Sequence, residues 1–164
     1  MFRKIMVPVD GSPTSNLGLE AAIKLAKDQK ATLFLFHVVD EALLIQDSPV
    51  FGASAYIDRL LTDLVSAGKQ VLADAEAKVR KHRISTRSLL LENVAASTAD
   101  LIVKQAKKWK ADLIVLGTHG RRGIRRLVMG SDAEGVIRTT PVPVLLVRAT
   151  ARAPRRTVKG ARKN

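Results

Sequence analysis

Short apolar segments alternate with segments of amphipathic helical pattern along this chain. The apolar segments predict strands at 4–9, 31–39, 86–91, 112–117 and 142–147. Strands that are apolar on both faces and alternate with helices are typical of a parallel sheet built from right-handed crossovers. The sequence therefore predicts an α/β fold, with one doubly wound, five-stranded parallel sheet and helices on both of its faces.

The intervening segments predict helices. The first follows the turn Asp10-Gly11-Ser12-Pro13, and either Ser12 or Thr14 can cap it. Further helices are predicted at 57–82, 95–110 and 132–140, while 40–54 is interpreted as a long loop. In the longest helix, apolar residues at helical spacing are expected to face inward. These are Leu60, Leu61, Leu64, Val71, Leu72, Ala75 and Val79.

Composition narrows the classes of protein that the chain can belong to. Its 164 residues, 46% of them hydrophobic, are enough for one domain with a sizeable core. Cysteine is absent, which excludes disulfides, thiolate zinc sites and a cysteine nucleophile. The sequence shows neither a secretory signal pattern nor an apolar run of membrane-spanning length. We therefore expect a cytoplasmic protein.

Positive charge is concentrated at the C-terminus. The chain has a net charge of +13, and its last sixteen residues carry six basic side chains and no acidic one. Residues 149–164 also lack apolar periodicity, which predicts a disordered basic tail after a domain at 1–148. Such a tail could contact nucleic acid or an anionic surface, or could simply be solvated.

The glycine-containing segment after the fourth predicted strand is the strongest indication of function. Gly117 and Gly120 are followed, after nine residues, by Gly130 and Ser131, where a helix is predicted to begin. Phosphate binding requires backbone N–H donors, an approach unobstructed by Cβ atoms and positive potential. We predict that this loop binds phosphate and that Ser131 caps the helix. The alternative is that the glycines merely permit a tight connection.

Other polar residues are candidates for ligand contact. Of the four arginines in the loop, Arg121 is the best candidate for a phosphate contact. Asp10 ends the first strand and Gly117 ends the fourth, and these two strand ends are expected to flank one cleft. Asp10 could bind ribose hydroxyls, hold a metal that bridges phosphates, or form an Asx-turn. His119 could donate to phosphate, whereas His37 is interpreted as a hydrogen-bonded core residue.

No catalytic constellation accompanies these residues. The P-loop pattern Gly-x-x-x-x-Gly-Lys-Ser/Thr is absent, as is the dinucleotide fingerprint Gly-x-Gly-x-x-Gly. No serine lies in a nucleophile-elbow context. The sequence therefore predicts a protein that holds a nucleotide and is not an enzyme, with weak ATP hydrolysis left open.

With these residues in place, the chain resembles the universal stress protein family over residues 1–148. The resemblance rests on IMVPVDGS at 5–12, HVVD at 37–40 and ADLIVLG at 111–117. Its most specific part is Gly117-x-x-Gly120-x9-Gly130-Ser131, the pattern of the family's ATP-binding branch. The resemblance implies strand order 3-2-1-4-5, an adenine nucleotide as ligand, and a homodimer paired through the strand at 142–147. An apolar edge strand left open would favour aggregation, which also supports pairing there. The expected nucleotide is ATP, either alone or with Mg²⁺ held through Asp10.

The resemblance also implies a nucleotide site. Asp10 would lie at the ribose and Val38 would offer backbone groups to adenine, while the loop glycines and Ser131 would hold the phosphates. The full predicted set is Pro8, Val9, Asp10, Val38, Leu116, Gly117, His119, Gly120, Arg121, Met129, Gly130, Ser131 and Asp132. Two places depart from the family pattern. Asp132 suits a helix start but opposes a triphosphate, and Glu92-Asn93-Val94 replaces a glycine-containing turn.

Functions from different classes remain open at this point. The first is an ATP-binding, dimeric stress-response protein that acts through nucleotide-dependent interactions. The second is a dimeric interaction module that binds no nucleotide. Nucleic-acid binding through the tail at 149–164 ranks last, because the tail has no aromatic side chain to stack on bases.

Overall fold

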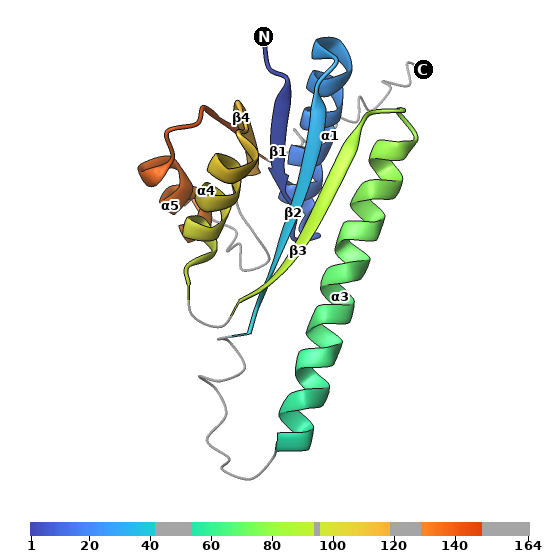
Figure 1. Cartoon of the computed structure of the whole chain (residues 1–164), viewed down its shortest axis with the longest axis vertical. Coiled ribbons are helices and arrows are strands. Elements are labelled where there is room, and N and C mark those ends of the chain that lie inside the picture. The colour runs from blue at the N-terminus through green and yellow to red at the C-terminus, as the bar shows by residue number, and fades with distance from the viewer. Residues whose placement is uncertain (42–53, 94–95, 119–128, 149–164) are drawn as a thin grey trace, which may run out of the picture.

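The computed structural model describes residues 1–41, 54–93, 96–118 and 129–148. Five parallel strands form one sheet in the order β3-β2-β1-β4-β5 (Figure 1). The predicted sheet, its parallel pairing and its strand order are confirmed. The strands are β1 (Lys4–Pro8), β2 (Thr32–Asp40), β3 (Thr86–Asn93), β4 (Leu113–Gly117) and β5 (Val144–Val147).

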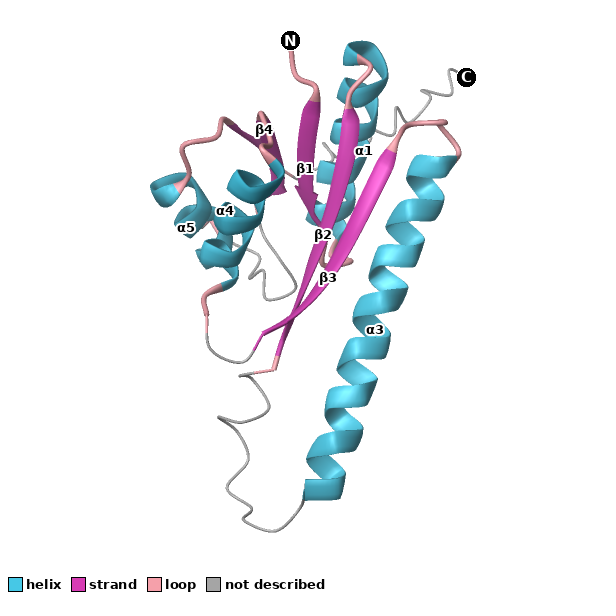
Figure 2. Cartoon of the chain, viewed as in Figure 1, coloured by secondary structure: helices cyan, strands magenta, loops and turns pink. Residues whose placement is uncertain are grey.

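Helices cover both faces of the sheet, as predicted. The helices of the described residues are α1 (Pro13–Gln29), α3 (Ser54–Arg80), α4 (Thr98–Trp109) and α5 (Ser131–Thr139). α1 and α3 lie on one face, and α4 and α5 lie on the other (Figure 2). Within the part of the chain that the structure describes, no helix is both long and apolar enough to cross a bilayer.

Alternate residues of the strands face two hydrophobic cores. In β1, Ile5 and Val7 belong to the core beneath α1 and α3, whereas Met6 belongs to the core beneath α4 and α5. All three side chains are fully buried. Burial on both faces explains why the central strands are apolar along their length.

Two serines fix the starts of helices. Ser12 Oγ accepts a hydrogen bond from the Ser15 N–H at 3.1 Å, so Ser12, one of the two predicted candidates, is the N-cap of α1. Pro13 follows in the first turn, where an N–H would have no intrahelical partner. Ser97 caps α4 in the same way through the Asp100 N–H, also at 3.1 Å.

The boundaries of several elements differ from the prediction. β2 and β3 continue to Asp40 and Asn93, because these two strands pair with each other beyond the end of β1. β5 begins at Val144, since Pro143 contributes a carbonyl to Ile114 N–H but has no N–H of its own. Most of the predicted loop at 40–54 lies outside the described residues.

The inward face of α3 is shorter than predicted. α3 begins at Ser54, and its N-terminal half extends past the sheet (Figure 1). Leu60, Leu61 and Leu64 are consequently half-buried and do not belong to the core. The core is reached only by the C-terminal half of the helix, through Leu72, Ala75 and Val79, with Val71 packed at its margin.

Candidate functional site

The carboxyl ends of β1 and β4 meet where the strand order of the sheet reverses. β1 leads to α1 on one face, whereas β4 precedes α5 on the opposite face. A Cβ built on Gly117 would lie only 2.7 Å from the carbonyl carbon and oxygen of Thr14, so β4 ends directly against the start of α1. Ligands of doubly wound sheets bind at this switch point. The structure thus brings Asp10 and Gly117 to the same edge of the sheet, together with Pro8, Val9 and Leu116.

Asp10 shapes the turn between β1 and α1. Its Oδ1 accepts a hydrogen bond from the Ser12 N–H at 2.9 Å, and its own N–H donates to Ser15 Oγ at 3.2 Å. Gly11 has φ 80°, a left-handed conformation that favours glycine. The Asx-turn considered for Asp10 is therefore formed, and Asp10 is half-buried at this edge of the sheet.

A backbone hydrogen bond closes the base of the loop between β4 and α5. The Gly130 N–H donates to the carbonyl oxygen of Thr118 at 2.9 Å, and the Thr118 N–H donates to the carbonyl oxygen of Val147 at 3.0 Å. The chain therefore leaves β4 and returns to α5 at one point, and Met129 and Gly130 are half-buried there. Three predicted site residues, His119, Gly120 and Arg121, lie outside the described residues.

The start of α5 corrects one prediction. Gly130 is the N-cap, with φ −66° and ψ 148° and no side-chain cap hydrogen bond, and Ser131 is the exposed first residue of the helix. Ser131 therefore does not cap α5, because the helix begins one residue earlier than that role requires. Asp132 and Glu134 lie in the first turn, where their charges are favourable to the helix dipole. Glu134 also pairs with Arg138 at 2.6 Å.

β2 continues beyond the end of β1 and borders the site. Pro8 pairs with Phe36, and the Val9 N–H donates to the Phe36 carbonyl at 2.8 Å. In a parallel strand, residues two apart direct their backbone polar groups to the same neighbour. Val38 therefore directs its N–H and C=O toward the β1 side, near Val9.

His37 belongs to the core, as predicted. It is 5% exposed, and its Nδ1–H donates to the carbonyl oxygen of Val9 at 2.6 Å. A Cβ on Gly68 of α3 would lie 2.9 Å from the ring carbon Cδ2. The ring thus joins the end of β1 to α3. Among the described residues, no group of three or more His, Cys, Asp or Glu side chains could hold a metal ion.

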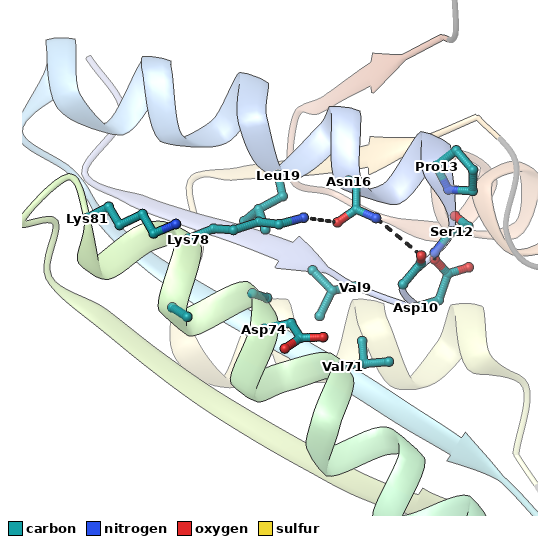
Figure 3. A pocket seen from close by; sticks show the side chains of 13 residues that line it. Val9, Asp10, Ser12, Pro13, Asn16, Leu19, Val71, Asp74, Lys78 and Lys81 are labelled. Carbon is teal, nitrogen blue, oxygen red and sulfur yellow. Dashed lines mark hydrogen bonds between the residues drawn. The ribbon is translucent and has the colours of Figure 1, made fainter.

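A groove between α1 and α3 opens beside Asp10 (Figure 3). It has a volume of about 770 Å³, and its polar lining includes Asp10, Asn16, Asp74 and Lys78. Lys78 Nζ donates to Asn16 Oδ1 at 2.6 Å, and Asn16 Nδ2 donates to the Gly11 carbonyl at 3.2 Å. α3 is thereby hydrogen-bonded to the turn that carries Asp10.

Comparison with known proteins decides the family. The model of the universal stress protein family matches residues 1–148. The chain belongs to the universal stress protein family. It is 34% identical to Universal stress protein MJ0531 of Methanocaldococcus jannaschii, over 90% of this chain and 83% of that protein. It is 31% identical to Universal stress protein YxiE of Bacillus subtilis, over 90% of this chain and 100% of that protein.

Solved structures of universal stress proteins share the fold. A family member from Burkholderia pseudomallei superposes with a TM-score of 0.70 at 31% identity, covering 90% of this chain and 97% of that one. The Archaeoglobus fulgidus universal stress protein in complex with dAMP has a TM-score of 0.62 at 22% identity, and the match covers 90% of this chain and 98% of that one. An Arabidopsis thaliana family member with AMP bound has a TM-score of 0.64 at 14% identity, and the match covers 91% of this chain and 93% of that one.

Sequence reasoning missed the residues of the groove between α1 and α3. Asn16 and Lys78 are 62 positions apart in the chain, and only the packing of the two helices brings them together. The sequence contains one signal for this groove. Asp74, Lys78 and Lys81 are separated by four and three residues, so they lie on one side of α3, next to its apolar stripe.

Proposed function

We propose that this universal stress protein binds an adenine nucleotide, and specifically ATP, at the edge formed by the carboxyl ends of β1, β2 and β4 and the start of α5. The Gly130–Thr118 hydrogen bond is the observation that carries the proposal. It holds the start of α5 directly beside the end of β4, at the switch point of the sheet. Universal stress proteins of similar fold in complex with dAMP and AMP support an adenine nucleotide as the ligand.

The phosphates would lie against the first turn of α5. The N-terminal amides of a helix lack intrahelical partners, and the helix dipole favours an anion there. The φ and ψ of Gly130 suit any residue, so backbone conformation does not demand glycine at this position. A close approach of phosphate to the backbone gives the reason for a glycine. Gly120, His119 and Arg121 of the loop would complete this part of the site, beside Met129, Ser131 and Asp132.

The nucleoside would extend from α5 toward β2. Asp10 would accept hydrogen bonds from the ribose hydroxyls, as its position at the end of β1 suggests. The backbone of Val38 would pair with adenine, because its polar groups point past the last residue of β1. Pro8, Val9, Leu116 and Gly117 would line the space between them.

Mg²⁺ fits this site only when it is bound together with the phosphates of the nucleotide. Mg²⁺ prefers octahedral oxygen coordination and commonly keeps several waters alongside phosphate oxygens. The described residues provide no cluster that could hold the ion by itself. Phosphate oxygens and water would therefore supply its ligands, while Asp10 stays assigned to the ribose.

The same site argues for binding without efficient hydrolysis. Phosphoryl transfer to water needs a group that orients the attacking water and cations placed on the transferred phosphate. Among the described residues, His37 is the buried histidine, and its bond to Val9 holds it in the core. We assign to this protein a role in stress responses. That role would depend on the nucleotide-bound state and on a homodimer paired through β5.

Calorimetry with a pair of glycine variants tests this function. Serine at position 130 is compatible with the backbone and a better N-cap than glycine, so Gly130→Ser keeps α5 while its side chain obstructs the phosphates. We expect ATP affinity to fall at least about tenfold, with an unchanged or higher Tm. Gly160→Ser, beyond the family match, is the matched control and should bind as wild type does. Equal ATP affinity of Gly130→Ser and wild type would contradict the proposal.

A further inference from the structure

The edge of the sheet opposite the proposed nucleotide site carries a dense group of basic side chains. α1, α3 and α4 all end at this edge, where the strands begin (Figure 1). Residues 1–4, 27–31, 80–85 and 107–112 form it, and we call them the basic rim. Backbone hydrogen bonds join these segments: Thr32 N–H to Arg3 at 2.9 Å, Leu33 N–H to Ser85 at 2.9 Å and Asp112 N–H to Lys4 at 2.9 Å. The rim is therefore one continuous surface.

The charge of the rim is strongly unbalanced. Its four segments contain ten lysines and arginines against two carboxylates, on a chain whose net charge is +13. The end of α4 alone contributes Lys107, Lys108 and Lys110, and all ten basic residues are exposed. One carboxylate, that of Asp112, is occupied by the backbone N–H of Arg3 at 2.7 Å and of Lys4 at 3.1 Å.

No ion pair neutralises a rim cation within the part of the chain that the structure describes. The ion pair found among the described residues joins Arg138 to Glu134 on α5, outside the rim. Lys4 lies 5.4 Å from the centre of the Trp109 ring and donates to the Trp109 carbonyl, which fixes its position without cancelling its charge. The remaining charge is available to an external anion.

Three rim residues hold backbone conformations that favour glycine. Lys30, Arg83 and Lys110 have φ of 54°, 56° and 57°, and they are the non-glycine residues of positive φ in the described chain. Glycine is the usual residue at such positions after a helix. Here each carries a basic side chain instead. Attraction to the helix C-terminus offsets part of the strain, and it also keeps all three charges at the same edge.

We propose that the basic rim binds the phosphate backbone of duplex nucleic acid without sequence preference. Exposed cations gathered at one edge of the sheet can contact several phosphates at once, and phosphate contacts supply most of the non-specific affinity for DNA. Single strands would require exposed aromatic side chains for stacking. Trp109 instead packs on Phe34, with ring centres 5.1 Å apart, and is only partly exposed. A membrane surface would favour apolar residues for insertion, and of the large exposed hydrophobic residues in the described ranges only Met1 lies in the rim.

This site is separate from the proposed nucleotide site, which lies at the carboxyl ends of the strands. The rim occupies their amino ends. Loss of ATP binding would therefore leave duplex binding intact, and each proposal can fail without the other.

The left-handed positions allow a test that removes charge without damaging the fold. Lys30→Gly, Arg83→Gly and Lys110→Gly combined remove three positive charges at places where glycine is conformationally favoured. The matched control combines Arg59→Gln, Lys69→Gln and Lys104→Gln, which removes the same charge from exposed positions of α3 and α4 outside the rim. The full-length chain is used throughout, so the segment 149–164 is common to all three proteins.

Binding of a short fluorescent DNA duplex is followed by anisotropy across a range of salt concentrations. We expect the rim variant to bind at least about tenfold more weakly than wild type and to lose up to about three units of the slope of log K against log salt. The control should remain close to wild type, and Tm should show that both variants are folded. Phosphatidylserine vesicles serve as the competing polyanion and should show no dependence on the rim.

Several results would overturn the proposal. Wild type could fail to bind the duplex, or the rim variant could bind it as well as wild type does. Equal weakening by the control would show that overall charge, not the rim, determines binding. Vesicle binding that the rim variant abolishes, with duplex binding retained, would assign the rim to a membrane.

Discussion

Gly117 ends β4 so close to Thr14 that a Cβ at this glycine would lie 2.7 Å from the Thr14 carbonyl carbon and oxygen. The contacted atoms belong to the backbone of α1 and cannot move aside as a flexible side chain would. Gly117 is thus required by the packing of α1 on β4. Gly130, the other described glycine of the phosphate-loop pattern, has an ordinary extended conformation.

The two glycines should therefore respond differently to the addition of a small side chain. Gly117→Ala is expected to lower the free energy of unfolding by about 1–3 kcal/mol, because α1 must shift to accommodate the methyl group. Gly130→Ser should leave it unchanged or raise it slightly, because serine suits an extended N-cap at least as well as glycine. Urea denaturation measures both. Similar losses at the two positions would show that Gly130 also has a structural role.

Removing the cap of α1 should destabilise the fold. Ser12→Ala deletes the Oγ that accepts the Ser15 N–H, at a cost of about 1 kcal/mol in the free energy of unfolding. Ser97→Ala at the start of α4 is the matched comparison and should cost a similar amount. Thermal unfolding detects such a loss in a domain of this size. An unchanged Tm in Ser12→Ala would mean that the cap is dispensable.

Neutralising the carboxylate at the start of α5 should favour triphosphates. Asp132 lies in the first turn, where it stabilises the helix but repels phosphate. Asp132→Asn is expected to tighten ATP binding by about two- to tenfold, with a smaller gain for AMP, which carries less charge. Calorimetry with both nucleotides measures the two gains. Weaker ATP binding in the variant would indicate that Asp132 contacts the ligand or its metal ion favourably.

A charge on the edge strand should separate the proposed dimer. Leu145 of β5 is 40% exposed, and β5 pairs with β4 on one side. Leu145→Lys is expected to convert a dimer into a monomer, as measured by light scattering during size-exclusion chromatography. Tyr56→Lys, at the start of α3, is the control and should stay dimeric. A dimeric Leu145→Lys protein would place the interface elsewhere.

The sequence was sufficient for the architecture and for the residues at the ends of β1 and β4. Continuous apolar runs such as 112–117 identified the buried strands, and Asp10 with Gly117 then followed from the parallel topology. The capping role of Ser131 was predicted incorrectly because glycine and serine are both acceptable N-caps, so the sequence does not specify which of the two caps α5.

Other features depend on packing that no local pattern specifies. Leu60, Leu61 and Leu64 continue the apolar stripe of α3, but they are half-buried and belong to neither hydrophobic core. β2 and β3 extend to Asp40 and Asn93 because the two strands satisfy each other's hydrogen bonds, although their last residues are polar. The bond between Lys78 and Asn16 joins helices that are distant in sequence.

The most direct test of the nucleotide site is a titration of the isotopically labelled protein with ATP, followed by the NMR shifts of its backbone amides. We predict saturable shifts that centre on Gly130, Ser131, Asp10 and Val38, with the amides of Asp74 and Lys78 little affected. Shifts centred on the groove between α1 and α3, or no saturable shifts at all, would contradict it.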